Sequence, residues 1–201
     1  EYLKEKPLVV VLGEGEHVVE ESWTNSYGRV YENTLDITCS NISFIGQSKD
    51  KTTVRGGIGV ENKKNVTVKS LTLTIPNGEL GLNVEGEEAS VEMMDVSVKE
   101  CGGSGLRVCS GASVKAAHCE FSENGGSGVF VLKGSKGIFT DCSIHHSGMD
   151  GVWTHGEGAL VELRGEQKEI HHNGDDGLSA WSNAAINIYI PSRSITALVH
   201  D

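Results

Sequence analysis

Short segments in which apolar and polar residues alternate recur along this chain at intervals of 23 to 26 residues. Alternation with a period of two over three to five residues is typical of a β-strand with one buried face. The clearest set places a glycine before an apolar residue, a variable residue and a second apolar or small residue. An interval of this length indicates a repeat architecture. The segments begin at Gly57, Gly81, Gly105, Gly128, Gly151 and Gly177.

Two further sets of alternating segments follow the same interval. One set lies at 42–44, 66–68, 91–93, 114–116, 138–140, 161–163 and 186–188, and its middle residues are predicted to face outwards. The other lies at 71–73, 96–98, 119–121, 142–144 and, less regularly, in a segment that ends at Ile170. Gly, Asn, Ser and Asp fill the gaps and suit tight corners, because they adopt positive φ or form local hydrogen bonds.

Three short strands per interval predict an all-β fold, a single-stranded right-handed parallel β-helix whose three parallel sheets run along one axis. We expect about seven coils of 22–26 residues. Residues 1–35 depart from the repeat and are interpreted as an N-terminal coil or cap, and 36–201 as one continuous series of coils. Residues 195–201 resemble the start of another coil. The chain is therefore predicted to be a fragment of a longer array or to associate edge to edge with itself through an uncapped coil.

Composition and charge narrow the class of partner. The chain has 26 Gly but only 4 Phe, 4 Tyr and 3 Trp, and columns of medium-sized aliphatic residues inside a solenoid explain that shortage of aromatics. The net charge is −11, and no basic run is longer than Lys63-Lys64. This balance predicts neither a nucleic-acid partner nor an anionic membrane surface.

The sequence says less about the compartment. No apolar run is long enough to span a bilayer, and no charged leader with a cleavage site is present, so neither a transmembrane segment nor a signal peptide is predicted. Five cysteines without CxxC spacing favour free, buried thiols over a disulfide framework or a zinc site. The odd number of free cysteines gives a small preference to an intracellular protein, and secretion stays open.

The corners of the repeat carry a family resemblance. Asn-Gly corners followed by the glycine-led strand occur at 123–129 (Glu-Asn-Gly-Gly-Ser-Gly-Val) and 172–178 (His-Asn-Gly-Asp-Asp-Gly-Leu). Over residues 36–190 this pattern resembles the right-handed β-helix region repeat family of the pectin-lyase-like superfold. The resemblance implies the fold but no single activity, since members include polysaccharide lyases, polygalacturonases, alginate epimerases and non-catalytic modules of F-box-type substrate adaptors.

The enzyme motifs of that superfold are poorly matched. Of the polygalacturonase-like motifs, only Asp175-Asp176 after Gly174 is similar, and His155-Gly156 is half of the histidine element. The Tyr-Gly-x-Asp-Pro-His signature of alginate epimerases is absent around Asp150, and Arg164 is the nearest basic residue for lyase-like chemistry. The missing motifs favour a protein that is not an enzyme.

One corner of the last coils nevertheless concentrates titratable residues. Equivalent positions in successive coils should stack His145 on His171, His146 on His172, and Asp150 near Asp176. Such a cluster can supply acid and base groups or bind a divalent metal, the one cofactor that the sequence suggests. The alternative is ordinary corner chemistry copied from coil to coil, with no cofactor. The catalytic candidates are Asp150, Asp175, Asp176 and His172, and the metal-ligand candidates are His145, His146, His171 and His172.

The outward positions of the glycine-led strands form a second candidate site. Phe130 and Trp153 are predicted to be neighbours on this face, and exposed aromatic rings beside polar groups suit stacking on sugar rings. A protein-interaction surface is an equal alternative, and a covering loop that buries the rings is a third. The ligand-binding candidates are Arg107, Phe130, Trp153, His155 and Trp181.

These observations lead to a non-catalytic β-helix module that binds a polysaccharide or a protein partner on its outer face. The competing interpretation is a polysaccharide-processing enzyme, a lyase, hydrolase or epimerase, that uses the acidic and histidine corners. A purely structural repeat array is the third.

Overall fold

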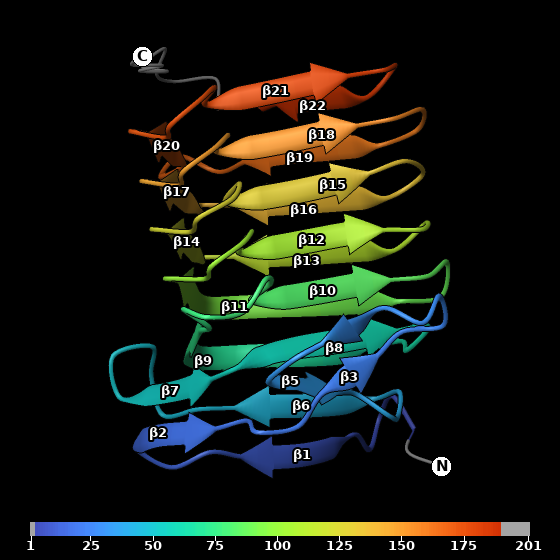
Figure 1. Cartoon of the computed structure of the whole chain (residues 1–201), viewed down its shortest axis with the longest axis vertical. Coiled ribbons are helices and arrows are strands. Elements are labelled where there is room, and N and C mark those ends of the chain that lie inside the picture. Colours follow the sequence, from blue (N-terminus) through green and yellow to red (C-terminus); the bar gives the residue numbers. More distant parts are fainter. Residues whose placement is uncertain (1–2, 190–201) are drawn as a thin grey trace.

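The computed structural model describes residues 3–189, which contain twenty-two β-strands and no helix, and all but two of these strands build a solenoid (Figure 1). The stacked coils make about six turns. Every strand of a coil pairs in parallel with its counterpart in the next coil, as the repeat predicted. The chain within this range has no helix long and apolar enough to cross a membrane.

The six glycine-led segments and one earlier strand form a seven-stranded parallel sheet, here named the first face. The register follows the repeat, so that Phe130 lies opposite Trp153 and Trp153 opposite Ser179. Its strands are β5 (Thr34–Asp36), β8 (Gly57–Glu61), β10 (Leu82–Glu85), β12 (Leu106–Cys109), β15 (Val129–Leu132), β18 (Val152–His155) and β21 (Leu178–Trp181).

The other two ladders are joined into one thirteen-stranded sheet, because two long strands run around the corner between them. In these strands Ser70 and Asp95 adopt φ of 55° and 54°, which turns the chain from one face to the next. The second face holds β1 (Leu8–Val11), β6 (Ile42–Ile45), β13 (Ser113–Ala117), β16 (Lys136–Thr140), β19 (Leu160–Arg164) and β22 (Ala185–Ile188). The third face holds β2 (Gly15–Val18), β7 (Thr52–Arg55), β14 (Glu120–Ser122), β17 (Ser143–His145) and β20 (Glu169–His171). The strands shared by both faces are β9 (Val66–Thr74) and β11 (Ser90–Lys99).

Inward positions of successive coils stack into apolar columns along the axis. Val60, Val84, Val108 and Val131 form one such column on the first face, and each is fully buried. Equivalent residues lie one strand spacing apart, about 4.8 Å, so aliphatic side chains of similar size fill the interior without gaps. All five cysteines are free thiols, as predicted, and four of them are buried.

The predicted outward orientation is wrong at Phe139. The register pairs Ala116 with Phe139, not with the residue after it, so the ring points inwards and is 1% exposed. The reason is Gly137, which occupies an inward position without a side chain. A Cβ there would lie 2.5 Å from the Phe139 ring, and that ring fills the space and packs edge to face on Phe121.

A small antiparallel hairpin, β3 (Trp23–Thr24) with β4 (Val30–Tyr31), lies over the first coils of the first face (Figure 1). The Trp23 and Tyr31 rings stack at 4.9 Å, and both are buried. The Trp23 ring lies so close to Gly59 that a Cβ at that glycine would be 2.4 Å from Cε3. The prediction of a further coil at 195–201 concerns residues outside the described range.

Candidate functional site

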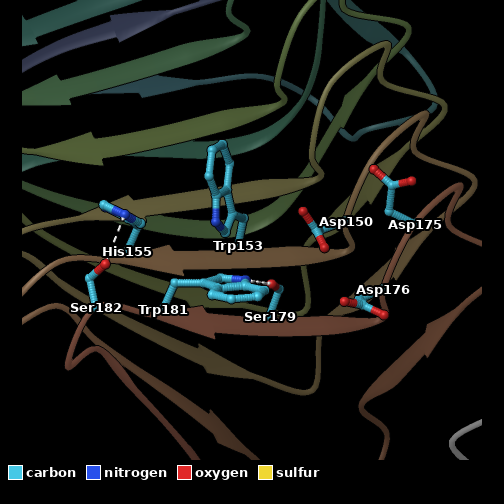
Figure 2. Close-up of a pocket in the computed structure, with 8 residues that line it drawn as sticks. All are labelled: Asp150, Trp153, His155, Asp175, Asp176, Ser179, Trp181 and Ser182. Carbon is cyan, nitrogen blue, oxygen red and sulfur yellow. Dashed lines mark hydrogen bonds between the residues drawn. The ribbon is translucent and has the colours of Figure 1, made fainter.

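The last coils of the first face carry a groove of about 650 Å³ (Figure 2). Two of its sides come from adjacent strands, β18 and β21, and its acidic edge comes from the corners that lead into those strands. We call this site the tryptophan groove. Its lining residues are Asp150, Trp153, His155, Asp175, Asp176, Ser179, Trp181 and Ser182.

Strand alternation places the aromatic side chains in the groove. Residues 152 and 154 of β18 point into the core, so Trp153 and His155 point outwards, where Ser179 and Trp181 stand opposite them on β21. Phe130, one coil earlier, stacks on Trp153 with the ring centroids 4.4 Å apart and the planes 4° from parallel. The Trp153 ring is therefore supported from behind by a second aromatic ring.

Hydrogen bonds hold the remaining groove side chains in place. The Trp181 indole Nε1 donates to Ser179 Oγ at 2.6 Å, although the Trp181 side chain is 61% exposed. Ser182 Oγ lies 3.2 Å from His155 Nε2 (Figure 2). A large exposed ring fixed in one orientation is suited to contact a flat ligand surface, because little side-chain freedom is lost on binding.

The three aspartates lie together on one side of the groove (Figure 2). Asp150 and Asp176 occupy the same corner position in successive coils, and Gly151 N donates to the Asp176 carbonyl at 2.9 Å. Asp150 is only 8% exposed, whereas Asp175 and Asp176 are exposed. Burial raises the pKa of the Asp150 carboxyl, and the neighbouring carboxylates of Asp176 and Asp175 raise it further against an opposing backbone hydrogen bond. The groove thus contains carboxyl groups in two different environments.

The sequence predicted the residues of this groove as two separate sites. The acidic candidates Asp150, Asp175 and Asp176 and the aromatic-face candidates Trp153, His155 and Trp181 line one pocket in the structure. The corner that precedes each strand places its carboxylates beside the aromatic side chains of that strand. Ser179 and Ser182 were not predicted as site residues. The signal for Ser179 was its outward position beside Trp153, and for Ser182 its place directly after β21.

Two other ligand-binding candidates lie outside the lining of the groove. Phe130 supports Trp153 from the previous coil. Arg107 belongs to a neighbouring pocket of about 1040 Å³ that also includes Tyr27, Lys133 and His155. Its guanidinium Nη1 donates to Asn83 Oδ1 at 3.2 Å.

The four histidines stack as the sequence predicted, but at the corner that follows the third face. His145 and His171 are parallel at 5.0 Å, and His146 and His172 at 5.1 Å. Within each coil the two Nδ1 atoms are 2.8 Å or 2.7 Å apart, so one imidazole donates to its neighbour. Burial, together with the neighbouring histidines, lowers the pKa of His171.

This arrangement satisfies ring nitrogens by contacts among the histidines themselves. His145 Nε2 also lies 3.3 Å from a Glu120 carboxylate oxygen. Within residues 3–189, no three His, Cys, Asp or Glu side chains converge as ligands for a metal ion. His172, a catalytic candidate, does not line the tryptophan groove.

Comparisons with known proteins agree with this architecture. The family described as "Right handed beta helix region" matches residues 8–136 and 108–190. No curated protein matches the sequence. A solved structure described as ORF18 of Geobacillus virus E2 is 15% identical with a TM-score of 0.51, over 85% of this chain and 33% of that chain.

Two polysaccharide-active enzymes are also structurally similar. Pectin methylesterase PemA from Erwinia chrysanthemi is 13% identical (TM-score 0.48, 79% of this chain and 58% of that chain). The A-module of mannuronan C-5 epimerase AlgE4 from Azotobacter vinelandii is 13% identical (TM-score 0.49, 90% of this chain and 68% of that chain). The chain spans about a third of the viral protein and about three fifths of the esterase. At such low identity these similarities concern the fold alone.

Proposed function

Because the chain belongs to the right-handed β-helix region family, whose fold carries many unrelated activities, we propose its function from the tryptophan groove: this groove binds a carbohydrate chain. Sugar rings would stack on Trp153 and Trp181, and their hydroxyl groups would hydrogen-bond to the aspartates, Ser182 and His155. The protein is then a binding module whose specificity comes from outward-facing side chains of its last coils.

The observation that carries this proposal is the pair of tryptophans on adjacent strands, one of them 61% exposed yet fixed by a hydrogen bond. The apolar C–H face of a sugar ring packs on an indole, and neighbouring polar groups fix its orientation. Burial by a covering loop was the alternative for Phe130 and Trp153, and within residues 3–189 both rings keep an intermediate exposure.

A protein partner is the alternative occupant of this site, and the volume of the groove is the observation that favours a sugar. Small-molecule pockets commonly measure about 300–1,000 Å³, and the groove, at about 650 Å³, falls in that range. Stable protein interfaces bury a flatter patch of about 800 Å² per partner around an apolar centre. The groove has the volume of a site for a few sugar units, and its three carboxylates lie on one side.

Hydrolysis of the bound glycan is the second candidate function, and the specific observation behind it is the difference between the aspartates. Glycosidases use one carboxyl that stays protonated as general acid and one ionised carboxylate as base or nucleophile. Asp150 is buried with a raised pKa, and Asp175 and Asp176 are exposed. In this mechanism Asp150 would protonate the glycosidic oxygen, and Asp175 or Asp176 would activate water or attack the anomeric carbon.

One experiment tests both functions. Intrinsic tryptophan fluorescence is titrated with a panel of neutral, acidic and amino-sugar oligosaccharides, and the same mixtures are analysed for newly formed reducing ends. We expect saturable binding that Trp181→Ala weakens by about tenfold, as loss of one stacking ring should. Met94→Ala removes an exposed apolar side chain from β11 on the second face and should leave binding unchanged.

The outcomes separate the two candidates. Binding without new reducing ends supports the binding module. New reducing ends that disappear in Asp150→Asn, while binding persists, establish glycan cleavage that depends on Asp150. If no oligosaccharide binds, or if Trp181→Ala and Met94→Ala bind equally well, the groove is not a carbohydrate site.

A further inference from the structure

The charge of the tryptophan groove is one-sided. Three of its eight lining residues are aspartates, and none is Lys or Arg. Some carboxylates elsewhere are paired with basic side chains, for example Glu79 with Arg29, Glu88 with Lys64, and Glu162 with both Lys136 and Arg164. Within residues 3–189, no basic side chain forms an ion pair with Asp150, Asp175 or Asp176.

We propose that the groove selects a positively charged glycan, an oligosaccharide of amino sugars whose amines are free and protonated. The proposal rests on the carbohydrate-binding function above and names the class of sugar that the groove prefers. Uncompensated carboxylates in a concave site concentrate negative potential, which attracts cations and repels anions. The carboxylates of a uronate polymer would be repelled by the three aspartate carboxylates of the groove.

The arrangement of the side chains matches such a ligand (Figure 2). The flat face of Trp181 and the ring of Trp153 lie on one side of the aspartates, so a sugar ring stacked on an indole has its edge towards the carboxylates. An ammonium group on that edge would donate charge-assisted hydrogen bonds, which are shorter and stronger than those from a hydroxyl. A protonated amine can also form a favourable cation–π interaction with the face of an adjacent indole.

Basic groups occur in the neighbouring pocket. Arg107 and Lys133 line that pocket, which shares only His155 with the tryptophan groove. Arg107 is already hydrogen-bonded to Asn83. Among the described residues that line the groove, only His155 can carry a positive charge, against three aspartates.

The test compares three oligosaccharides of equal length: glucosamine, N-acetylglucosamine and galacturonate oligomers. Fluorescence titrations are run near pH 6, first at low ionic strength and then at physiological salt. We expect the glucosamine oligomer to bind about tenfold more tightly than the acetylated oligomer at low salt, and the galacturonate oligomer to bind most weakly. Physiological salt should reduce the advantage of the glucosamine oligomer by several fold.

Two variants with the same change in net charge show where selectivity arises. Asp175→Asn with Asp176→Asn should bring the glucosamine affinity down to that of the acetylated oligomer. Glu92→Gln on the second face with Asp95→Asn at the corner of β11 should leave the tenfold difference intact. Trp181→Ala should weaken both oligomers by the same factor.

The results also distinguish failure of this proposal from failure of the proposed function. If the acetylated oligomer binds as tightly as the amine, or the uronate binds best, charge selection is overturned while carbohydrate binding stands. Equal loss in both charge variants overturns the role of these aspartates. If none of the three oligomers binds but a neutral sugar from the wider panel does, only the amino-sugar proposal falls.

Discussion

The two halves of the first face have the same backbone arrangement but differ in whether their outward side chains are covered. At the covered half, Gly59 and Asn83 occupy outward positions. The Trp23 ring nevertheless lies against Gly59, and Asn83 is only 1% exposed. At the open half, Phe130 of β15 and Trp153 of β18 point outwards. The tryptophan groove lies over β18 and β21. Strand alternation therefore decides which side chains leave the core, and a separate segment decides which of them meet solvent.

The covered half is held by polar contacts as well as by the Trp23 ring. Asn25 donates to the Glu85 carboxylate at 3.1 Å, although Glu85 is only 3% exposed. The Ser26 amide donates to Glu61 at 3.1 Å. The residues beneath the hairpin therefore stabilise the fold, whereas those of the open half are available for binding.

The largest expected difference between the halves is in stability. Trp23→Ala removes a ring that is 3% exposed and stacks on Tyr31, so we expect the free energy of unfolding to fall by about 3–5 kcal/mol. Trp181→Ala removes an equally large but exposed ring and should change it by less than about 0.5 kcal/mol. Urea denaturation followed by far-ultraviolet circular dichroism measures both. Equal losses in the two variants would abolish the distinction between a covered and an open half.

A smaller effect is expected from adding one methyl group. Gly59→Ala places a Cβ against the Trp23 ring and should displace the hairpin, at a cost of about 1–3 kcal/mol. Ser179→Ala, at the matching outward position of the open half, deletes only the hydroxyl that accepts the Trp181 hydrogen bond. Because the exposed Trp181 indole N–H can then donate to water, the expected cost is below about 0.5 kcal/mol. Thermal denaturation ranks the pair, and a neutral Gly59→Ala would show that the hairpin does not press on the sheet.

The smallest expected effect is the pH dependence of stability that Asp150, the buried carboxyl of the open half, produces. Because the pKa of Asp150 is raised, the folded protein holds this proton more tightly than the unfolded chain. The stabilisation by the protonated form is complete below the ordinary aspartate pKa and is lost as pH rises through the folded pKa. Asp150→Asn should therefore be more stable than the wild type at neutral pH, and the difference should shrink in acid. Urea denaturation across this pH range measures the difference, and identical profiles for Asp150→Asn and the wild type would contradict the assigned environment.

The repeat made much of this structure predictable from sequence. Once the interval is known, each residue has a column, and the Phe130–Trp153 stack, the histidine stacks and the Asp150–Asp176 neighbours follow from register alone. Side chains one coil apart must lie about one strand spacing apart.

What the sequence did not predict lies where the repeat is broken or where two features meet. Residues 23–31 follow no repeat, so nothing placed their hairpin over Gly59 and Asn83. Phe139 turned inwards because a core glycine left room for its ring. The acidic corner and the aromatic stripe were treated as separate sites, since the period gives position along the axis but not the shape of the surface between a corner and its strand.

The most direct measurement of the central claim observes the three tryptophan side chains at once. In a ¹H–¹⁵N spectrum each indole N–H gives its own signal, and glucosamine oligomers are titrated into the labelled protein. Carbohydrate binding in the open half predicts saturable shifts for Trp153 and Trp181 with a common dissociation constant, while the signal of Trp23 under the hairpin stays fixed. Shifts confined to Trp23, or none at Trp153 and Trp181 with any glycan of the panel, would contradict it.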